Sequence, residues 1–293
     1  MTAHPTSRLR AARIAPRAKT WLAQSRQAHV LHSFERVINL VNQEAEVLAL
    51  ASWELGSGPF TLLLEDGSFP NGIQLESPLL VFENGFWIGD WLIDAEGTEL
   101  SQPRPHWEVA RNNRANYKWA QGIITPLLDK HAPPDSLARL VLNPLGTSAL
   151  PARLQQAAEQ NIPLLFSGLA EGNLEAVRKA SKALAGLGPG FTPAGDDLLL
   201  GVMHALWATR PDADSFSQAI AHAAAPRTHV LSTAWLTAAA DGEAAEPWQA
   251  LITSLAGRHK DQLEAAVMRI LPTGHTSGAD ALAGFVGLLQ HAT

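Results

Sequence analysis

Residues 186–206 constrain the fold of this chain more than any other stretch. They read Gly-Leu-Gly-Pro-Gly-Phe-Thr-Pro-Ala-Gly-Asp-Asp-Leu-Leu-Leu-Gly-Val-Met-His-Ala-Leu, a glycine-rich loop followed by an almost wholly apolar helix. Glycine permits positive φ and close approach of a ligand to the backbone, and the free N–H groups at a helix start attract anions. The stretch therefore predicts half of an active or binding site. Its predicted anion-binding residues are Gly188, Gly190, Thr192, Gly195 and Asp196.

The same pattern returns near the C-terminus. Residues 195–201 read Gly-Asp-Asp-Leu-Leu-Leu-Gly and residues 278–284 read Gly-Ala-Asp-Ala-Leu-Ala-Gly, so both fit Gly-x-Asp-x-Leu-x-Gly, and Asp197 corresponds to Asp280. In a helix the aspartate and the second glycine lie on one face, where glycine lets another helix approach. We therefore expect the two helices to cross near their second glycines, with their N-termini and both carboxylates converging.

The candidate catalytic residues follow from this convergence. Two close carboxylates repel each other, so Asp197 and Asp280 are expected to share a proton or to bind a cation such as Mg²⁺. His275 is the one histidine in a motif context and is a candidate acid or oxyanion donor. Further predicted binding residues are Thr228, Ser232, Ser277 and Gly278.

Helix capping is the alternative for several of these side chains. Thr228 and Ser232 lie near a predicted helix start, where hydroxyls often cap. Ser277 and Asp280 have the spacing of a capping box, in which each side chain bonds the other's backbone. At the first copy Ala194 stands where the capping hydroxyl would be, so Asp197 needs another partner.

Composition excludes several kinds of site. The chain of 293 residues has no cysteine, which rules out disulfides, thiolate zinc sites and cysteine nucleophiles. Its eleven histidines include no close ligand set typical of a transition metal. No apolar run is long enough to cross a membrane, so we expect a cytoplasmic protein without membrane contact.

Charge is distributed unevenly along the chain. The net charge is −6, yet residues 1–34 carry six bases and no acid. Residues 1–27 are therefore interpreted as a basic arm that packs on the acidic remainder of the chain. Binding to a polyanion is the alternative, but the segment lacks the regular interleaving of basic and aromatic residues that stacks on bases, and we expect no nucleic-acid partner.

The remainder predicts an α+β fold. Short apolar runs between residues 28 and 94, separated by turns such as Glu-Asp-Gly-Ser and Pro-Asn-Gly, indicate an antiparallel sheet or small barrel. A helix over residues 107–128 is expected to close this β-rich domain, assigned to 28–134. Residues 135–293 are expected to form an α-helical domain that carries both glycine motifs.

The two motifs resemble a known family. Residues 186–201 and 274–284 look like the signature segments of a bacterial domain family of unknown function that includes the AllH-type subunit of oxamate carbamoyltransferase. Residues 228–232 and 33–40 are similar to further segments of it. The resemblance implies a subunit that works with partner subunits in allantoin and purine breakdown, converting oxalurate and phosphate to oxamate and carbamoyl phosphate.

The sequence leaves other functions open. A non-catalytic scaffold or small-anion-binding protein would also use a glycine-rich loop. Residues 192–201 are similar to the Gly-Ala-Gly-Asp stretch of ribokinase-like sugar kinases as well, although those enzymes alternate strands with helices. A small anionic substrate or phosphate is the expected ligand in each case.

Overall fold

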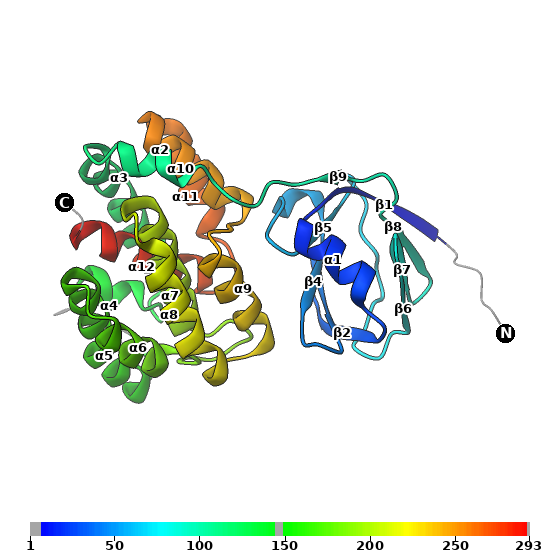
Figure 1. Ribbon diagram of the computed structural model, residues 1–293, viewed down its shortest axis with the longest axis horizontal. Coiled ribbons are helices and arrows are strands. Elements are labelled where there is room, and N and C mark those ends of the chain that lie inside the picture. Colours follow the sequence, from blue (N-terminus) through cyan, green and yellow to red (C-terminus); the bar gives the residue numbers. More distant parts are fainter. Residues whose placement is uncertain (1–6, 144–148, 292–293) are drawn as a thin grey trace. The chain divides into compact units, whose positions relative to one another are not determined.

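The chain contains a β-rich unit followed by a helical unit, as the sequence predicts (Figure 1). The computed structural model describes residues 7–143 and 149–291, with the side chain of residue 291 left out. The two compact units are Met1–Pro103 and Arg104–Thr293. Within the described residues, no helix is long and apolar enough to cross a membrane.

The first unit is a nearly closed, barrel-like sheet. Its elements are β1 (Ser7–Ile14), α1 (Pro16–Gln24), β2 (Ala28–Ser33), β3 (Val37–Asn42), β4 (Val47–Ala51), η1 (Trp53–Leu55), β5 (Thr61–Leu64), β6 (Leu79–Phe82), β7 (Gly85–Ile88), β8 (Trp91–Asp94) and β9 (Glu99–Leu100). The strand order is β2-β3-β4-β5-β1-β8-β7-β6, and β9 pairs with β1. The two end strands, β2 and β6, contact each other. The sheet therefore encloses its own core.

Strand pairing is mixed rather than purely antiparallel. Five pairings in the described residues are antiparallel, while β4–β5, β1–β8 and β1–β9 are parallel. Strand β1 lies in the middle of the sheet, between β5 and β8, and runs antiparallel to β5 but parallel to β8. The short apolar runs between residues 28 and 94 form strands, and the last of them splits into β7 and β8 at a turn.

The expected basic arm differs from what the structure has. Residues 7–24 form β1 and α1, which belong to the sheet unit, while residues 1–6 lie outside the described part. In β1 the exposed Arg8 and Arg10 alternate with the less exposed Leu9 and Ala11, which is the two-residue period of a strand. In α1 the side chain of Trp21 is buried, and its Nε1 donates to Glu46 O at 2.9 Å. The segment is therefore structural.

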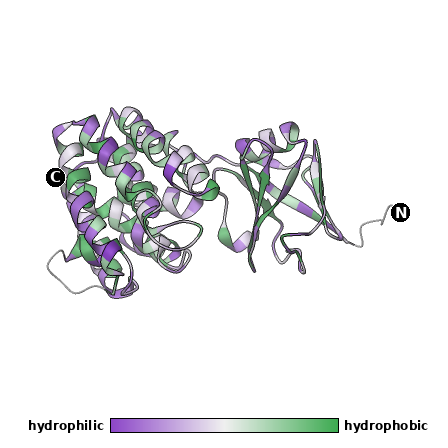
Figure 2. Ribbon diagram, turned by 90° about the horizontal axis from the view of Figure 1, so that it is seen from below, coloured by the Kyte–Doolittle hydropathy of each residue, from purple (hydrophilic) through white to green (hydrophobic). Residues whose placement is uncertain are grey.

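The second unit is entirely helical in its described residues. Its elements are α2 (Trp107–Asn112), α3 (Asn116–His131), α4 (Ala138–Leu142), α5 (Ala152–Glu171), α6 (Leu174–Leu184), α7 (Ala194–Thr209), α8 (Ala213–Ala224), η2 (Ala225–Arg227), α9 (Val230–Ala240), α10 (Glu246–Gly257), α11 (Lys260–Ile270) and α12 (Ser277–His291). Most of these helices carry both hydrophobic and hydrophilic residues (Figure 2). Such amphipathic helices bury one face against their neighbours.

The predicted closing helix of the β-rich domain belongs to the helical unit instead. The unit boundary lies at Pro103, not near residue 134. Helix α2 packs against α7 and α10, and helix α3 packs against α12, α11 and α10. The buried Trp107 donates from Nε1 to Gly242 O at 2.7 Å, and Tyr117 donates from its hydroxyl to Ala208 O at 2.9 Å. The aromatic side chains of this segment therefore find their partners in the second unit.

Helices α7 and α12 form the centre of the helical unit. Every residue of α7 except Leu200 is buried, which explains why its sequence is apolar on all sides. Helix α12 packs against α7 more extensively than any other pair of described elements pack together. These two helices are the ones that begin with the repeated motif.

Candidate functional site

The two copies of the motif meet where α7 and α12 cross. A Cβ atom at Gly201 would overlap the backbone oxygen of Ala281, and a Cβ atom at Gly284 would overlap the backbone oxygen of Leu198. The contact is reciprocal, because the same offset of 83 positions relates Gly201 to Gly284 and Leu198 to Ala281. The predicted helix crossing is confirmed, and each helix contributes the equivalent glycine and the equivalent carbonyl oxygen to it.

The loop before α7 requires its glycines. Gly188 and Gly190 have φ values of +118° and +97°, a region that L side chains rarely adopt. Their backbone N–H groups and that of Thr192 have no acceptor among the described residues, and Gly190 is exposed. The loop therefore presents accessible backbone donors, as an anion site requires.

Two other predicted binding glycines have a packing role instead. A Cβ atom at Gly195 would overlap Leu184 O, and one at Gly278 would overlap Ile270 O. Their N–H groups also donate hydrogen bonds: Gly195 N donates to Leu187 O at 2.9 Å, and Gly278 N donates to Thr273 O at 3.0 Å. The N–H group of Gly278 is thus unavailable to an anion, and the two loops are unequal as anion sites.

Asp196 ties the loop to the turn before α9. Its Oδ1 accepts from Gly186 N at 3.0 Å and its Oδ2 accepts from the hydroxyl of Thr228. Burial raises the pKa of Asp196, while the bonds from Thr228 and Gly186 oppose that rise. Ser232 donates to Phe191 O at 3.5 Å. These predicted binding residues do come together, but they largely satisfy one another.

Asp197 is buried without a complete set of partners. Its residue is 7% exposed, and its Oδ2 has no hydrogen-bond partner within the described part of the chain. Burial raises the pKa of Asp197 well above its ordinary value, the hydroxyl of Ser277 opposes this, and the negative charge of Asp280 raises the pKa further. This carboxyl group is therefore held protonated more readily than an ordinary aspartate.

Asp280 is fully buried but better held. Its Oδ1 accepts from Ser136 Oγ at 2.6 Å and from Leu137 N at 2.7 Å, while its Oδ2 has no partner in the described regions. Burial raises the pKa of Asp280 to about 6, and the hydrogen bond from Ser136 is the largest effect opposing the rise. Sequence reasoning did not find Ser136, because it lies 144 residues from Asp280 and no motif surrounds it.

The capping box expected at Ser277 and Asp280 is wrong. Ser277 Oγ lies 3.0 Å from Thr192 Oγ1, so its hydroxyl joins the two loops. The carboxylate of Asp280 accepts from the turn before α4, and the nearby hydroxyl of Thr276 also lowers its pKa. Tertiary packing provides both side chains with partners from other segments.

His275 lies on the surface of the second loop. Its side chain is 76% exposed, and its Nε2 lies 3.0 Å from Asp135 Oδ2. The described residues show no hydrogen bond or ion pair between His275 and Asp197 or Asp280. The structure therefore places this candidate on the same loop as the buried pair, but with a different carboxylate as its partner.

The carboxylates offer limited metal ligation. Among residues 7–143 and 149–291, no group of three His, Asp or Glu side chains could hold a metal ion. Two carboxylate oxygens, Oδ2 of Asp197 and Oδ2 of Asp280, are buried and unpartnered. Mg²⁺ commonly binds through one or two carboxylates with water and substrate phosphate, so the residues present fit that ion in the presence of a phosphate.

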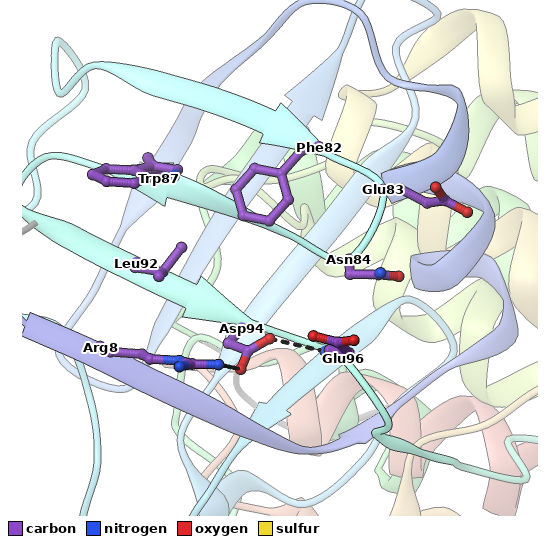
Figure 3. A pocket seen from close by; sticks show the side chains of 8 residues that line it. All are labelled: Arg8, Phe82, Glu83, Asn84, Trp87, Leu92, Asp94 and Glu96. Carbon is purple, nitrogen blue, oxygen red and sulfur yellow. Dashed lines mark hydrogen bonds and ion pairs between the residues drawn. The ribbon is translucent and has the colours of Figure 1, made fainter. Parts of the chain in front are cut away.

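A separate pocket lies in the β-rich unit. It has a volume of about 480 Å³ and lies over β6, β7, β8 and β1, where Phe82, Trp87 and Leu92 line it beside Arg8 and Asp94 (Figure 3). Arg8 pairs with Asp94 and, as the main cause, lowers the pKa of that carboxyl group. None of the predicted site residues lines this pocket.

Fold and site together define an α+β protein whose helical unit carries a paired loop–helix site with two buried carboxylates. The family described as oxamate carbamoyltransferase subunit AllH has a model that matches residues 184–289. This match spans both motifs and, over that segment, confirms the resemblance to the AllH-type family drawn from them. Residues 33–40, for which the sequence also predicted a resemblance to that family, lie outside the matched segment, so that resemblance stays a prediction. No solved structure matches the chain.

Proposed function

We propose that this chain is a subunit of a carbamoyl-transferring enzyme that converts oxalurate and phosphate to oxamate and carbamoyl phosphate. The proposal depends chiefly on one observation: the segment that matches the AllH family contains two converging buried carboxyl groups, each with one oxygen that has no partner among the described residues. Buried groups with perturbed pKa values gather at functional sites. A purely structural helix crossing needs the glycines but not the two aspartates.

The loop over residues 186–192 is the proposed anion site. Its three free N–H groups would hold phosphate or the substrate carboxylate, and positive charge is available beside it. Arg227 is exposed and its backbone packs against Gly186, while His229 is near enough to lower the pKa of Asp196. An anion would therefore meet backbone donors and two basic side chains.

Proton transfer is the proposed role of the carboxyl pair. Phosphate oxygen attacks the carbamoyl carbon, the bond from that carbon to the ureido nitrogen breaks, and the departing nitrogen takes one proton to become the amide of oxamate. A carboxyl group with a raised pKa can hold that proton near neutral pH and donate it. Asp280, with a pKa of about 6, and Asp197 both fit this role. Mg²⁺, if bound, would supply charge neutralisation for the phosphate.

Two activity measurements test the proposal. The chain alone and the chain with partner subunits of an oxamate carbamoyltransferase would be assayed for carbamoyl phosphate formed from oxalurate and phosphate. We expect turnover with the partners, and a loss of about 100-fold or more in kcat for Asp197→Asn and Asp280→Asn. Asp214→Asn, an exposed aspartate in the opening turn of α8, is the matched control and should keep full activity.

A scaffold role is the second candidate. Asp196, Thr228 and Ser232 largely satisfy one another, which suits a loop built for rigidity. Full activity of both aspartate variants in the reconstituted enzyme would favour it and would contradict the catalytic site. The ribokinase-like alternative loses support, because the glycine-rich loop joins helices α6 and α7 rather than a strand and a helix.

A further inference from the structure

One short turn outside the matched family segment contacts two of the three candidate catalytic groups. Ser136 and Leu137 donate to Asp280 Oδ1, and Asp135 pairs with His275 through Oδ2 and Nε2 at 3.0 Å. The turn lies between α3 and α4, some 140 residues before the second motif. Its neighbours in sequence carry no motif of their own.

The hydroxyl of Ser136 has only one possible direction. Ser136 Oγ accepts from Ala138 N at 3.0 Å, and a serine hydroxyl has a single hydrogen to donate. That hydrogen goes to Asp280 Oδ1 at 2.6 Å. Ser136 and Asp280 are both completely buried, so water cannot replace either partner without rearrangement. The carboxyl group is therefore fixed in rotation as well as in position.

Both donors converge on the same oxygen. Oδ1 of Asp280 receives the hydroxyl of Ser136 and the N–H of Leu137, and Oδ2 is unpartnered within the described residues. A carboxyl group held in this way presents one defined oxygen to a reacting atom or a cation. The turn thus selects which oxygen of Asp280 is available.

We infer that the turn formed by residues 135–137 is a positioning element of the reaction site, in which Ser136 orients the carboxyl group of Asp280 and Asp135 orients the imidazole of His275. The inference rests on the proposed function. It adds to the site a segment in which the sequence predicted no site residue. Ser136 acts through Asp280 and does not touch the substrate.

Kinetics of the reconstituted enzyme test this inference. Ser136→Ala should lower kcat about 10- to 100-fold, as is typical when a residue behind a functional group is removed, with KM for oxalurate and phosphate within about twofold. Ser136→Thr keeps the hydroxyl and should restore most of kcat. Ser181→Ala is the matched control, because Ser181 is equally buried in α6 and its hydroxyl has no partner in the described residues. It should leave kcat unchanged.

A double variant separates this inference from the proposed function. If Ser136 acts through Asp280, then Ser136→Ala combined with Asp280→Asn should be no slower than Asp280→Asn alone. An inactive Asp280→Asn together with a fully active Ser136→Ala would overturn the inference and leave the proposed function standing. Full activity of Asp280→Asn would overturn both.

A structural readout covers the case in which Ser136→Thr folds poorly. Thermal melting would show that outcome, and a crystal structure of Ser136→Ala would then decide. We expect the carboxyl group of Asp280 to rotate about its χ2 angle once the hydroxyl is lost. An unchanged orientation, held by Leu137 N alone, would contradict the role assigned to Ser136.

Discussion

The two copies of Gly-x-Asp-x-Leu-x-Gly share a backbone arrangement but not an environment. In both, the second glycine lets the other helix approach, and the first glycine packs against the carbonyl oxygen of the preceding helix. Their aspartates differ: Asp280 receives two donors from the turn before α4, whereas Asp197 has Oδ2 unpartnered in the described residues and only hydroxyls nearby. The loops differ too, since Thr273 O takes the N–H group of Gly278, whereas the N–H group of Gly190 has no acceptor in the described part of the chain.

This difference teaches that a repeated motif need not repeat a function. Packing requires the glycines equally in both copies, so their recurrence follows from the helix crossing. The first loop keeps backbone N–H groups without an acceptor in the described residues, whereas the aspartate after the second loop is held in a fixed orientation by Ser136 and Leu137. Four measurements would break or sharpen this comparison.

The largest effect is expected at the crossing itself. Gly201→Ala and Gly284→Ala should each lower the free energy of unfolding by at least about 3 kcal/mol, because the added methyl group meets backbone rather than a movable side chain. Urea denaturation would measure this. Gly122→Ala in α3, where a Cβ atom meets nothing within 4 Å, should instead gain about 0.5–1 kcal/mol. A loss at only one of the two glycines would disprove the reciprocal crossing.

Removing the buried charges should stabilise the protein while abolishing its function. At pH 7, Asp197→Asn should raise the free energy of unfolding by about 1–3 kcal/mol, because burying Asp197 costs either a desolvated negative charge or the uptake of a proton, and its Oδ2 has no partner in the described residues. Asp280→Asn should gain less, since Ser136 and Leu137 already support that group. Thermal melting of both variants would check the order. A larger gain for Asp280→Asn would reverse the comparison between the two sites.

Stability should depend on pH through Asp280 in a defined window. The folded protein keeps this proton up to about pH 6, whereas an ordinary aspartate releases it near pH 3.8. The contribution of Asp280 to the free energy of unfolding therefore falls as pH rises from about 4 to about 6, by at most about 1.4 kcal/mol per pH unit. The free energy of unfolding would be measured by denaturation at each pH for Asp280→Asn and for the unaltered chain. The difference between the two isolates the contribution of Asp280. A difference that grows more favourable with pH would contradict the raised pKa.

The smallest effect is expected at the contact between the two loops. Thr192→Val and Ser277→Ala should each cost about 0.5–1.5 kcal/mol, the typical value of one hydrogen bond. Because both variants remove the same interaction, the double variant should cost less than the sum of the two. Additive losses in this double-mutant cycle would mean that the hydroxyls act separately.

Local patterns predicted much of the fold. The apolar periods at residues 194–209 and 277–291, the turn residues between the strands and the shared glycines all depend on neighbours within a few positions. For the same reason the crossing of α7 and α12 follows from the spacing of the motifs alone. The strand β1 was not predicted, because its arginines indicate a charged arm more strongly than their alternation with Leu9 and Ala11 indicates a strand.

Other parts of the site could not be predicted in this way. Predicted ligands such as Gly195 and Gly278 prove to be packing residues, because a glycine that admits a ligand and one that admits a helix look alike in sequence. The sequence placed the domain boundary near residue 134 instead of at Pro103, because the sequence of a helix that follows strands does not indicate which unit the helix packs against.

The sequence by itself determined that two loop–helix units with paired aspartates would converge. A glycine four residues after each aspartate lies on the same helix face, where it lets the other helix pack closely. Only the tertiary structure decided how each aspartate is held. Ser136 and Asp280 are 144 residues apart, and their hydrogen bond depends on how α3, α4 and α12 pack. Hydrogen bonds of this kind produce no periodic pattern in a sequence, because the side-chain donor can belong to any segment that lies nearby in the folded chain.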